Sequence, residues 1–158
     1  MKKLERKEYK DGKNYSGSWI LEYDEYQYPK DLVKVTNLIK EKLNPKYLSP
    51  KYRETNKTNS LFGHCYHSTQ SLYYFFITAS LKVMSAECEY TGHHYWLEDK
   101  DKNIIDITDE QYYSVGRTPP YDKGKEVKRW YAWKGQVHKR SMNLMKDVQP
   151  NANLYHTE

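Results

Sequence analysis

The sequence predicts an α+β fold in which helices pack against a small antiparallel sheet. Two segments with apolar residues at helical spacing come first, and three runs with the alternation typical of β-strands follow them. The last two runs flank the short charged turn DKDK, which is typical of an antiparallel hairpin. With 158 residues, 15% of them aromatic, the chain can bury one core, so we expect a single domain over residues 1–158.

The first 60 residues are predicted to hold one short strand, one helix and a long loop. Residues 1–18 are charged and contain Gly and Ser, which indicates a peripheral or frayed segment. Residues 19–26 alternate in part, as a short strand or an edge segment would. Residues 28–45 have apolar residues at helical spacing and end at an Asn-Pro pair, which predicts a helix. Residues 46–60 are polar and are predicted to form a loop.

The later elements are expected to be a helix, four strands and a last short helix. They are the helix from Cys65 to about Leu81, the strands 81–90, 93–98, 103–108 and 130–133, and the helix 139–146. The residues of chemical interest all lie within 59–146, which we therefore regard as the motif-bearing core.

The net charge of +5 is small, and residues of both signs are interspersed along the chain. A solvated surface of mixed charge accounts for the basic excess, so a nucleic-acid partner is not expected. No apolar run approaches the ~20 residues of a membrane span, and no apolar segment follows the basic N-terminal residues as in a signal peptide. We therefore expect a cytoplasmic protein with reduced thiols and no membrane partner.

One of the two cysteines, Cys65, follows Gly63 and His64 at the start of a predicted helix. The first turn of a helix has unpaired backbone N–H groups and the positive end of the helix dipole, and both favour a thiolate. The backbone N–H of Cys65 would also lie where an oxyanion develops during acyl transfer. The position therefore fits a nucleophile; the alternative is a small residue that fills space in the core. The other cysteine, Cys88, is expected to be inert on the apolar face of its strand.

A thiolate nucleophile needs a general base, and the predicted hairpin supplies a candidate pair. His94 lies on one face of its strand, and a turn centred on Lys100 would place it directly opposite Asp106. A carboxylate there would fix the tautomer of the imidazole and stabilise the imidazolium. The expected catalytic residues are therefore Cys65, His94 and Asp106. A slip of one residue in the register would move Asp106 to the other face.

Four further residues are candidates for contact with substrate or with an oxyanion. Asn59 and Gln70 carry amide N–H groups that could act as the second oxyanion donor. His64 adjoins the nucleophile and either contacts substrate or caps the loop before the helix. Trp96 shares the strand face of His94 and is expected to contact substrate.

The motifs GHCYHSTQSLYYF, HHYWLEDKDKNIIDITDEQY and TPPYDKGK…KRSMNLM occur in this order over residues 59–146. They resemble a family of small phage-encoded proteins with the pattern Gly-His-Cys-Tyr, His-Trp-Phe-Leu and Leu-Asp-Pro-Thr…Gln-Phe. That pattern is similar to the papain-like and transglutaminase-like cysteine hydrolases, in which a cysteine begins a helix and a histidine and an aspartate follow on adjacent strands. The resemblance implies this fold, with Cys65 as nucleophile, His94 as base and Asp106 as the acid that orients it. The chain departs from the family in having Ile107 where the pattern has proline.

The expected activity is that of a cysteine hydrolase or acyl-transferase that acts on a protein, a peptide or a small amide and needs no cofactor. If the chain is phage-encoded, it would act in the host cytoplasm. The rival hypothesis is a non-catalytic binding protein on the same fold, which would block a host protein or sequester a nucleotide.

Two other functions are less well supported by the spacing of residues. The histidines at 64, 67, 93 and 94 could bind zinc together with Cys65, but no CxxC, HxxxH or HExxH spacing occurs, so no metal site is predicted. Segment 123–140 interleaves basic residues with Trp130, Tyr131 and Trp133 and could bind single-stranded nucleic acid. We favour an ordinary strand with a solvated basic face.

Overall fold

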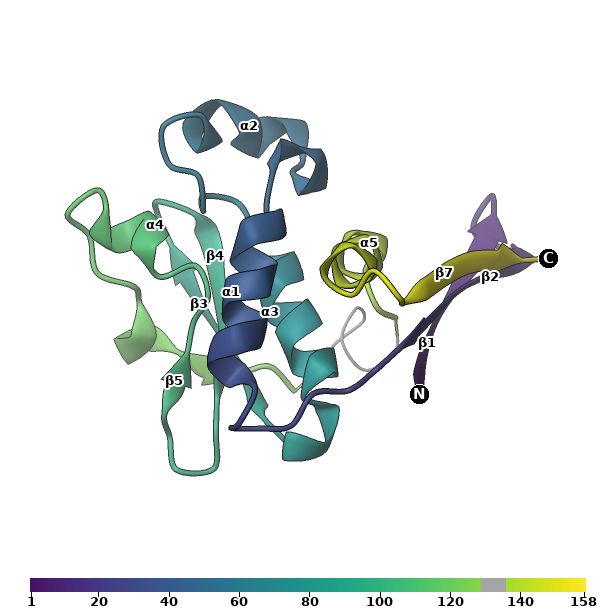
Figure 1. Ribbon diagram of the computed structural model, residues 1–158. Coiled ribbons are helices and arrows are strands. Elements are labelled where there is room, and N and C mark those ends of the chain that lie inside the picture. The colour runs from purple at the N-terminus through teal and green to yellow at the C-terminus, as the bar shows by residue number, and fades with distance from the viewer. Residues whose placement is uncertain (129–135) are drawn as a thin grey trace.

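The computed structural model describes residues 1–128 and 136–158, which form two antiparallel sheets with helices between them (Figure 1). The strand orders are β1-β2-β7 in one sheet and β5-β4-β3-β6 in the other. The strands are β1 (Lys2–Lys10), β2 (Asn14–Tyr23), β3 (Lys82–Cys88), β4 (Gly92–Glu98), β5 (Ile104–Ile105), β6 (Lys125–Glu126) and β7 (Asn153–Thr157). The helices are α1 (Leu32–Lys42), α2 (Pro50–Asn56), α3 (Cys65–Phe75), α4 (Glu110–Tyr113) and α5 (Lys139–Val148), with 3-10 turns η1 (Pro45–Tyr47), η2 (Ile77–Ala79) and η3 (Tyr121–Lys123). The predicted α+β class is confirmed.

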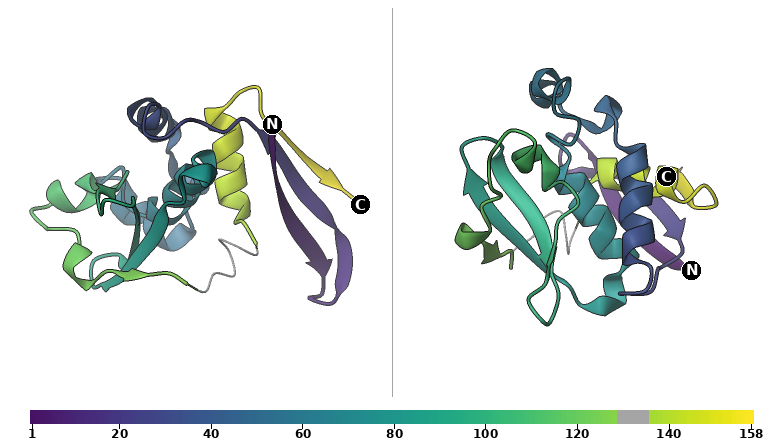
Figure 2. Two further views of the ribbon diagram at one scale, coloured as in Figure 1. Left: turned by 90° about the horizontal axis from the view of Figure 1, so that it is seen from below. Right: turned by 60° about the vertical axis from the view of Figure 1, so that its left-hand side comes forward.

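The three-stranded sheet joins the two ends of the chain. β1 and β2 pair along their whole length and β7 pairs with β2, so the prediction of a frayed segment at residues 1–18 is wrong. Leu21 and Tyr23 of β2 are buried in the core, and this apolar face fixes the sheet to the helices. The hairpin of β1 and β2 still reaches away from the helices, so these residues do lie at the periphery (Figure 2).

The middle of the chain follows the prediction more closely. α1 lies within the predicted helix 28–45, and the predicted loop 46–60 instead holds η1 and α2. Pro45 and Pro50 stand in the first turns of these two short helices, where the fixed φ of proline favours the helical conformation. α5 confirms the helix predicted at 139–146. The strand predicted at 130–133 lies outside the described residues.

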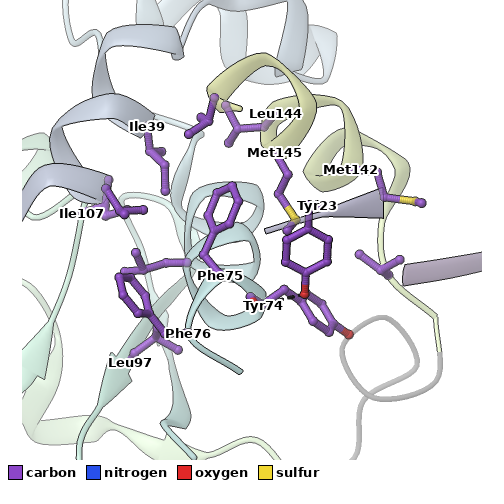
Figure 3. Close-up of a cluster of buried hydrophobic side chains, with 14 of the residues drawn as sticks. Tyr23, Ile39, Tyr74, Phe75, Phe76, Leu97, Ile107, Met142, Leu144 and Met145 are labelled. Atoms are coloured by element: carbon purple, nitrogen blue, oxygen red, sulfur yellow. Dashed lines mark hydrogen bonds between the residues drawn. The ribbon is translucent and has the colours of Figure 1, made fainter. Parts of the chain in front are cut away.

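The main core lies between α1, α3 and α5, next to the four-stranded sheet. Consecutive residues at the end of α3 pack in two directions (Figure 3). Phe75 points into the space between the helices near Ile39 and Met145, and Phe76 points toward Leu97 of β4. All five side chains are at most 1% exposed. α3 is therefore held between the helices and the sheet, and its first residue has a fixed position.

The loop that leads into α3 is closely packed. Asn56 is buried, and its Nδ2 donates hydrogen bonds to carbonyl groups within residues 59–62. Gly63 has a φ of +86°, and a Cβ atom there would lie 2.9 Å from both Leu48 Cδ2 and Tyr52 Cβ. A side chain at this position would have to adopt a left-handed backbone and displace the buried Leu48 and the half-buried Tyr52. The loop thus needs glycine two residues before the cysteine.

Among the residues that the structure describes, no helix is both long enough and apolar enough to cross a lipid bilayer.

The close packing around Gly63 predicts that Gly63→Ala destabilises the fold. We expect a loss of about 2–4 kcal/mol, because strain at a positive φ and crowding in a packed site each cost about 1–3 kcal/mol. Gly116→Ala is the matched control, since Gly116 also has a positive φ (+73°) but no atom within 4 Å of a Cβ. Urea unfolding measures both variants. Equal losses for the two would contradict the role of packing at Gly63.

Candidate active site

Cys65 begins α3 and lines a cavity of about 400 Å³. Its side chain is nearly buried, at 8% exposed, and the Sγ–H donates to the backbone carbonyl of His93 at 3.7 Å. As the first residue of the helix, Cys65 has a backbone N–H without a partner inside the helix. The cysteine therefore lies where the sequence predicted it, at a helix start and open to a cavity large enough for a small ligand.

His94 of β4 and Asp106, which follows β5, form a close buried pair. His94 Nε2 lies 2.6 Å from Asp106 Oδ2, and the two side chains are 0% and 2% exposed. Burial by itself lowers the pKa of His94. The hydrogen bond to the Asp106 carboxylate and the proximity of the Cys65 side chain, with the charges of both groups, outweigh burial and raise the pKa to about 9. The His94 ring is therefore the positively charged imidazolium at neutral pH.

The two nitrogens of the His94 ring face different partners. Nε2 is taken by Asp106, so Nδ1 is the nitrogen left for the thiol. Cys65 is close enough to raise the pKa of His94, but Nδ1 forms no hydrogen bond of standard geometry with any described residue. A loose contact of this kind is common in ligand-free active sites and tightens when substrate binds. Cys65, His94 and Asp106 are thus brought together, in that order.

The register of the hairpin differs from the prediction by two residues. Leu97 pairs with Ile105 and Glu98 with Ile104, which would place Asp106 opposite Trp96 and not opposite His94. A shift of two residues leaves every side chain on its original face of the sheet, whereas a shift of one would have reversed it. Asp106 therefore reaches His94 diagonally, and the predicted pair forms in spite of the wrong register.

Asp106 has two further hydrogen-bond donors. The backbone N–H of Thr108 donates to Oδ1 at 3.1 Å, and the hydroxyl of Tyr121 donates to Oδ2 at 2.7 Å. Burial first, and then the charge of Asp106, raises the pKa of Tyr121, so its hydroxyl stays protonated and remains a donor. Both carboxylate oxygens are satisfied, which holds the group in one orientation toward His94. Tyr121 belongs to the motif TPPYDKGK, but nothing in the sequence indicated this role for it.

Trp96 closes the site from behind and does not reach the cavity. Its ring stacks on the His94 ring with centroids 5.6 Å apart, and it meets Tyr121 edge to face at 5.1 Å. Gly124 packs so closely on it that a Cβ there would lie 2.5 Å from Trp96 Cζ2. The residues that line the cavity do not include Trp96. The prediction of substrate contact is therefore wrong, and Trp96 instead shields the histidine from water.

The two amides proposed as oxyanion donors both serve the fold. Asn59 Nδ2 donates to the Tyr90 hydroxyl at 2.9 Å and to the Gln111 carbonyl at 2.8 Å, which uses both of its N–H groups. Gln70 is fully buried; its Oε1 accepts from the backbone N–H of His138 at 3.0 Å, and its side chain also bonds Tyr66. Neither amide lines the cavity. Both predictions are corrected, since a donor already used by the protein is not free for an oxyanion.

His64 forms a buried pair with His67 and does not line the cavity. His64 Nδ1 lies 2.7 Å from His67 Nε2. Burial lowers the pKa of His64 to about 4, and burial followed by the proximity of His64 and Arg140 lowers the pKa of His67 well below its ordinary value. Both rings are therefore neutral at pH 7, and a single N–H···N hydrogen bond joins them. In the described part of the chain, no group of three or more His, Cys, Asp or Glu side chains could hold a metal ion.

Several residues around Cys65 were missed by the sequence analysis. The cavity is lined by Ser49, Lys51, Tyr52, Gly63, Cys65, Tyr66, His67, Thr91, Gly92, His93, Tyr95, Gln111, His138 and Arg140. Gln111 is fully buried, and its Oε1 has no hydrogen-bond partner among the described residues, so it can accept a bond from a ligand. Its only signal in the sequence is its place in the motif TDEQY. The aromatic residues of the proposed nucleic-acid segment, Trp130, Tyr131 and Trp133, lie outside the described residues.

The raised pKa of His94 predicts that stability falls as the pH rises from about 6.5 to about 9. The folded state binds the proton more tightly than the unfolded chain does, so its contribution is complete below pH 6.5 and lost above pH 9. The free energy of unfolding should fall by at most about 1.4 kcal/mol per pH unit in this window. Urea unfolding at several pH values measures it. Asp106→Asn removes a cause of the shift and should flatten the curve; an unchanged slope would contradict the assignment.

The bond between Tyr121 and Asp106 predicts a change in the titration of His94. Tyr121→Phe removes one donor from Oδ2, so more of the carboxylate charge acts on the imidazolium and the titration midpoint rises. ¹⁵N NMR of the His94 ring measures that midpoint directly. Tyr113→Phe, on an exposed tyrosine, is the control and should leave it unchanged. A midpoint that stays the same or falls in Tyr121→Phe would show that the hydroxyl does not act through Asp106.

No protein-family model, curated protein or solved structure matches this chain. The membership of a phage-encoded family that the motifs suggest therefore stays a prediction, as does the papain-like architecture. The chemistry open to the protein is indicated by Cys65, His94 and Asp106 and by the residues that line the cavity.

Proposed function

We propose that the protein is a cysteine-dependent hydrolase or acyl-transferase that acts on an amide, ester or thioester. One observation carries the proposal: the buried His94 ring binds Asp106 through Nε2, and Cys65 lies close enough to the ring to raise its pKa. A nucleophile, a base and a group that orients the base are the three parts that covalent acyl transfer needs. All three are buried, next to a cavity that a substrate can enter.

The proposed reaction has two steps. The Cys65 thiolate attacks the carbonyl carbon, a sulfur–carbon bond forms, and the bond to the leaving amine or alcohol breaks as His94 Nδ1 gives it a proton. Water then attacks the thioester and gives a proton to His94; the carbon–sulfur bond breaks, the acid is released, and Cys65 leaves as the thiolate. An amine in place of water would give acyl transfer. Asp106 stabilises the imidazolium throughout and does not itself take the proton.

The start of α3 offers stabilisation for the oxyanion of each step. The backbone N–H of Cys65 belongs to the first turn of the helix, where N–H groups lack partners and the helix dipole is positive. Removing one such donor from an enzyme commonly costs 100-fold or more in rate. Gln111 lines the same cavity, but its Nε2 donates to Thr108 Oγ1 and its unpaired Oε1 is an acceptor, so it suits an N–H group of the substrate and not the oxyanion.

The order of the elements supports a papain-like or transglutaminase-like relationship. The cysteine begins a helix that packs on β4, where Thr69 Oγ1 donates to the carbonyl of Tyr95 at 3.2 Å. The histidine lies on that same strand, and the aspartate follows the next strand of the sheet. This is the arrangement that the motifs imply, and we include a phage origin in the proposal on those motifs alone.

A binding protein on the same fold is the second candidate. It is favoured by the contact of Cys65 Sγ with the His93 carbonyl, and by the absence of a standard hydrogen bond to Nδ1 among the described residues. A protein that only binds its ligand has no need for a thiol activated by histidine.

Thiol alkylation separates the two candidates. At pH 7 iodoacetamide should label Cys65 faster than a free thiol by about 10- to 30-fold, because only a few per cent of an ordinary thiol is ionised at this pH. His94→Ala should reduce the labelling rate of Cys65 to that of a free thiol. Cys88 is partly exposed and serves as an internal control in the same sample, read by peptide mass, and its rate should not change. Slow labelling of Cys65, or labelling indifferent to His94, would reject the enzyme.

A further inference from the structure

The cavity at Cys65 is lined by basic groups and by no acidic one. Lys51 of α2, Arg140 of α5 and three histidines, His67, His93 and His138, contribute to its wall, and no carboxylate does so among the described residues. The rest of the wall is polar or aromatic, with the rings of three half-buried tyrosines. The permanent positive charge of this wall is that of Lys51 and Arg140, which favours an anionic substrate over a neutral one.

Lys51 and Arg140 are not neutralised by the protein. Lys51 Nζ lies 4.9 Å over the Tyr52 ring, and Arg140 Nη1 donates to the Ser49 hydroxyl at 3.3 Å. Neither is within ion-pair distance of a carboxylate in the described part of the chain. Two lysines close to Lys51 in the sequence behave differently: Lys46 pairs with Asp147 and Lys57 pairs with Glu54, both at 2.9 Å.

Arg140 lines the cavity next to His138. It stands in the first turn of α5, where its backbone N–H donates to His138 Nδ1 at 3.1 Å. After burial, the charge of Arg140 is the next influence that lowers the pKa of His138. The first turns of α3 and α5 both border the cavity, and the partial positive charge of each helix end adds to that of the side chains.

We infer that the substrate of the proposed acyl transfer carries a carboxylate beside the acyl group, and that Lys51 and Arg140 bind it. The inference rests on the proposed function, because it assigns a substrate class to the same cysteine. The planar fork of arginine suits a carboxylate, which accepts two parallel hydrogen bonds from it. The tyrosines provide apolar walls for the remainder of a small acidic acyl compound or the end of an acidic peptide. The cavity of about 400 Å³ suits a ligand of that size.

Two small alkylating reagents test the inference without knowledge of the substrate. Iodoacetate and iodoacetamide transfer similar groups to a thiol but differ by one negative charge. The rate with iodoacetate divided by the rate with iodoacetamide should be about 3- to 10-fold higher for Cys65 than for N-acetylcysteine amide. Because 0.5 M NaCl screens charge, it should reduce this ratio. Because both rates come from the same protein, a change in the ionisation of the thiol cancels in the ratio.

Matched variants assign the preference to particular residues. Lys51→Gln with Arg140→Gln should lower the ratio to that of the free thiol, whereas Arg140→Lys should keep most of it. Lys46→Gln with Lys57→Gln removes the same total charge outside the cavity and should leave the ratio unchanged. All four side chains are exposed or largely so, and near-UV circular dichroism checks that each variant is folded.

The outcomes separate the two proposals. Fast labelling of Cys65 that depends on His94, with a ratio no higher than that of the free thiol, would overturn the anionic substrate and leave the enzyme standing. An equal fall of the ratio in both double variants would also overturn it, because the preference would then reflect net charge. Slow labelling by both reagents would reject the enzyme and, with it, the inference.

Discussion

The contact of 2.6 Å between His94 Nε2 and Asp106 Oδ2 is the interaction on which the rest of the site depends. A buried imidazole would normally lose its proton, and a buried carboxylate is costly unless it is paired. Each group removes the penalty of the other, and Thr108 and Tyr121 satisfy the remaining lone pairs of the carboxylate. The four-stranded sheet is required because it carries the histidine on β4 and delivers the aspartate from the end of β5. Trp96 then keeps water from competing for the same hydrogen bonds.

The second sheet contributes through α5. β2 buries Leu21 and Tyr23 in the same core as Met142 and Met145 of α5, so the two ends of the chain hold this helix in place. The first turn of α5 is fixed separately, since Gln70 Oε1 accepts from the N–H of His138. Gln70 is therefore a tether between the helix that carries the nucleophile and the helix that carries Arg140. An amide that resembled an oxyanion donor in the sequence instead sets the width of the cavity.

The predictability of this site differs from residue to residue for physical reasons. Cys65 and His94 were accessible because the start of a helix and the face of a strand follow from local pattern alone. Asp106 was identified from a register that is wrong by two residues. Because side chains alternate between the two faces of a strand, an error of two residues left Asp106 on the correct face. Asn59 and Gln70 could not be judged, because whether an amide is free depends on partners 52 and 68 positions away in the chain. The strand β1 was missed for a related reason: its charged residues suit an exposed edge strand as well as a frayed segment.

The same distinction applies to charge. A net charge of +5 spread over both signs indicated only a solvated surface, and no count of basic residues could improve on that. What matters is which cations the fold leaves without a carboxylate. Asp147 and Glu54 neutralise Lys46 and Lys57, and the buried pair of His64 and His67 stays neutral because desolvation opposes a charge there. Asp106 compensates the protonated His94, so the positive charge that remains beside Cys65 without a carboxylate is that of Lys51 and Arg140. A carboxylate would compensate that charge, and the lining of the cavity supplies none, so the compensating group is one that a substrate would bring.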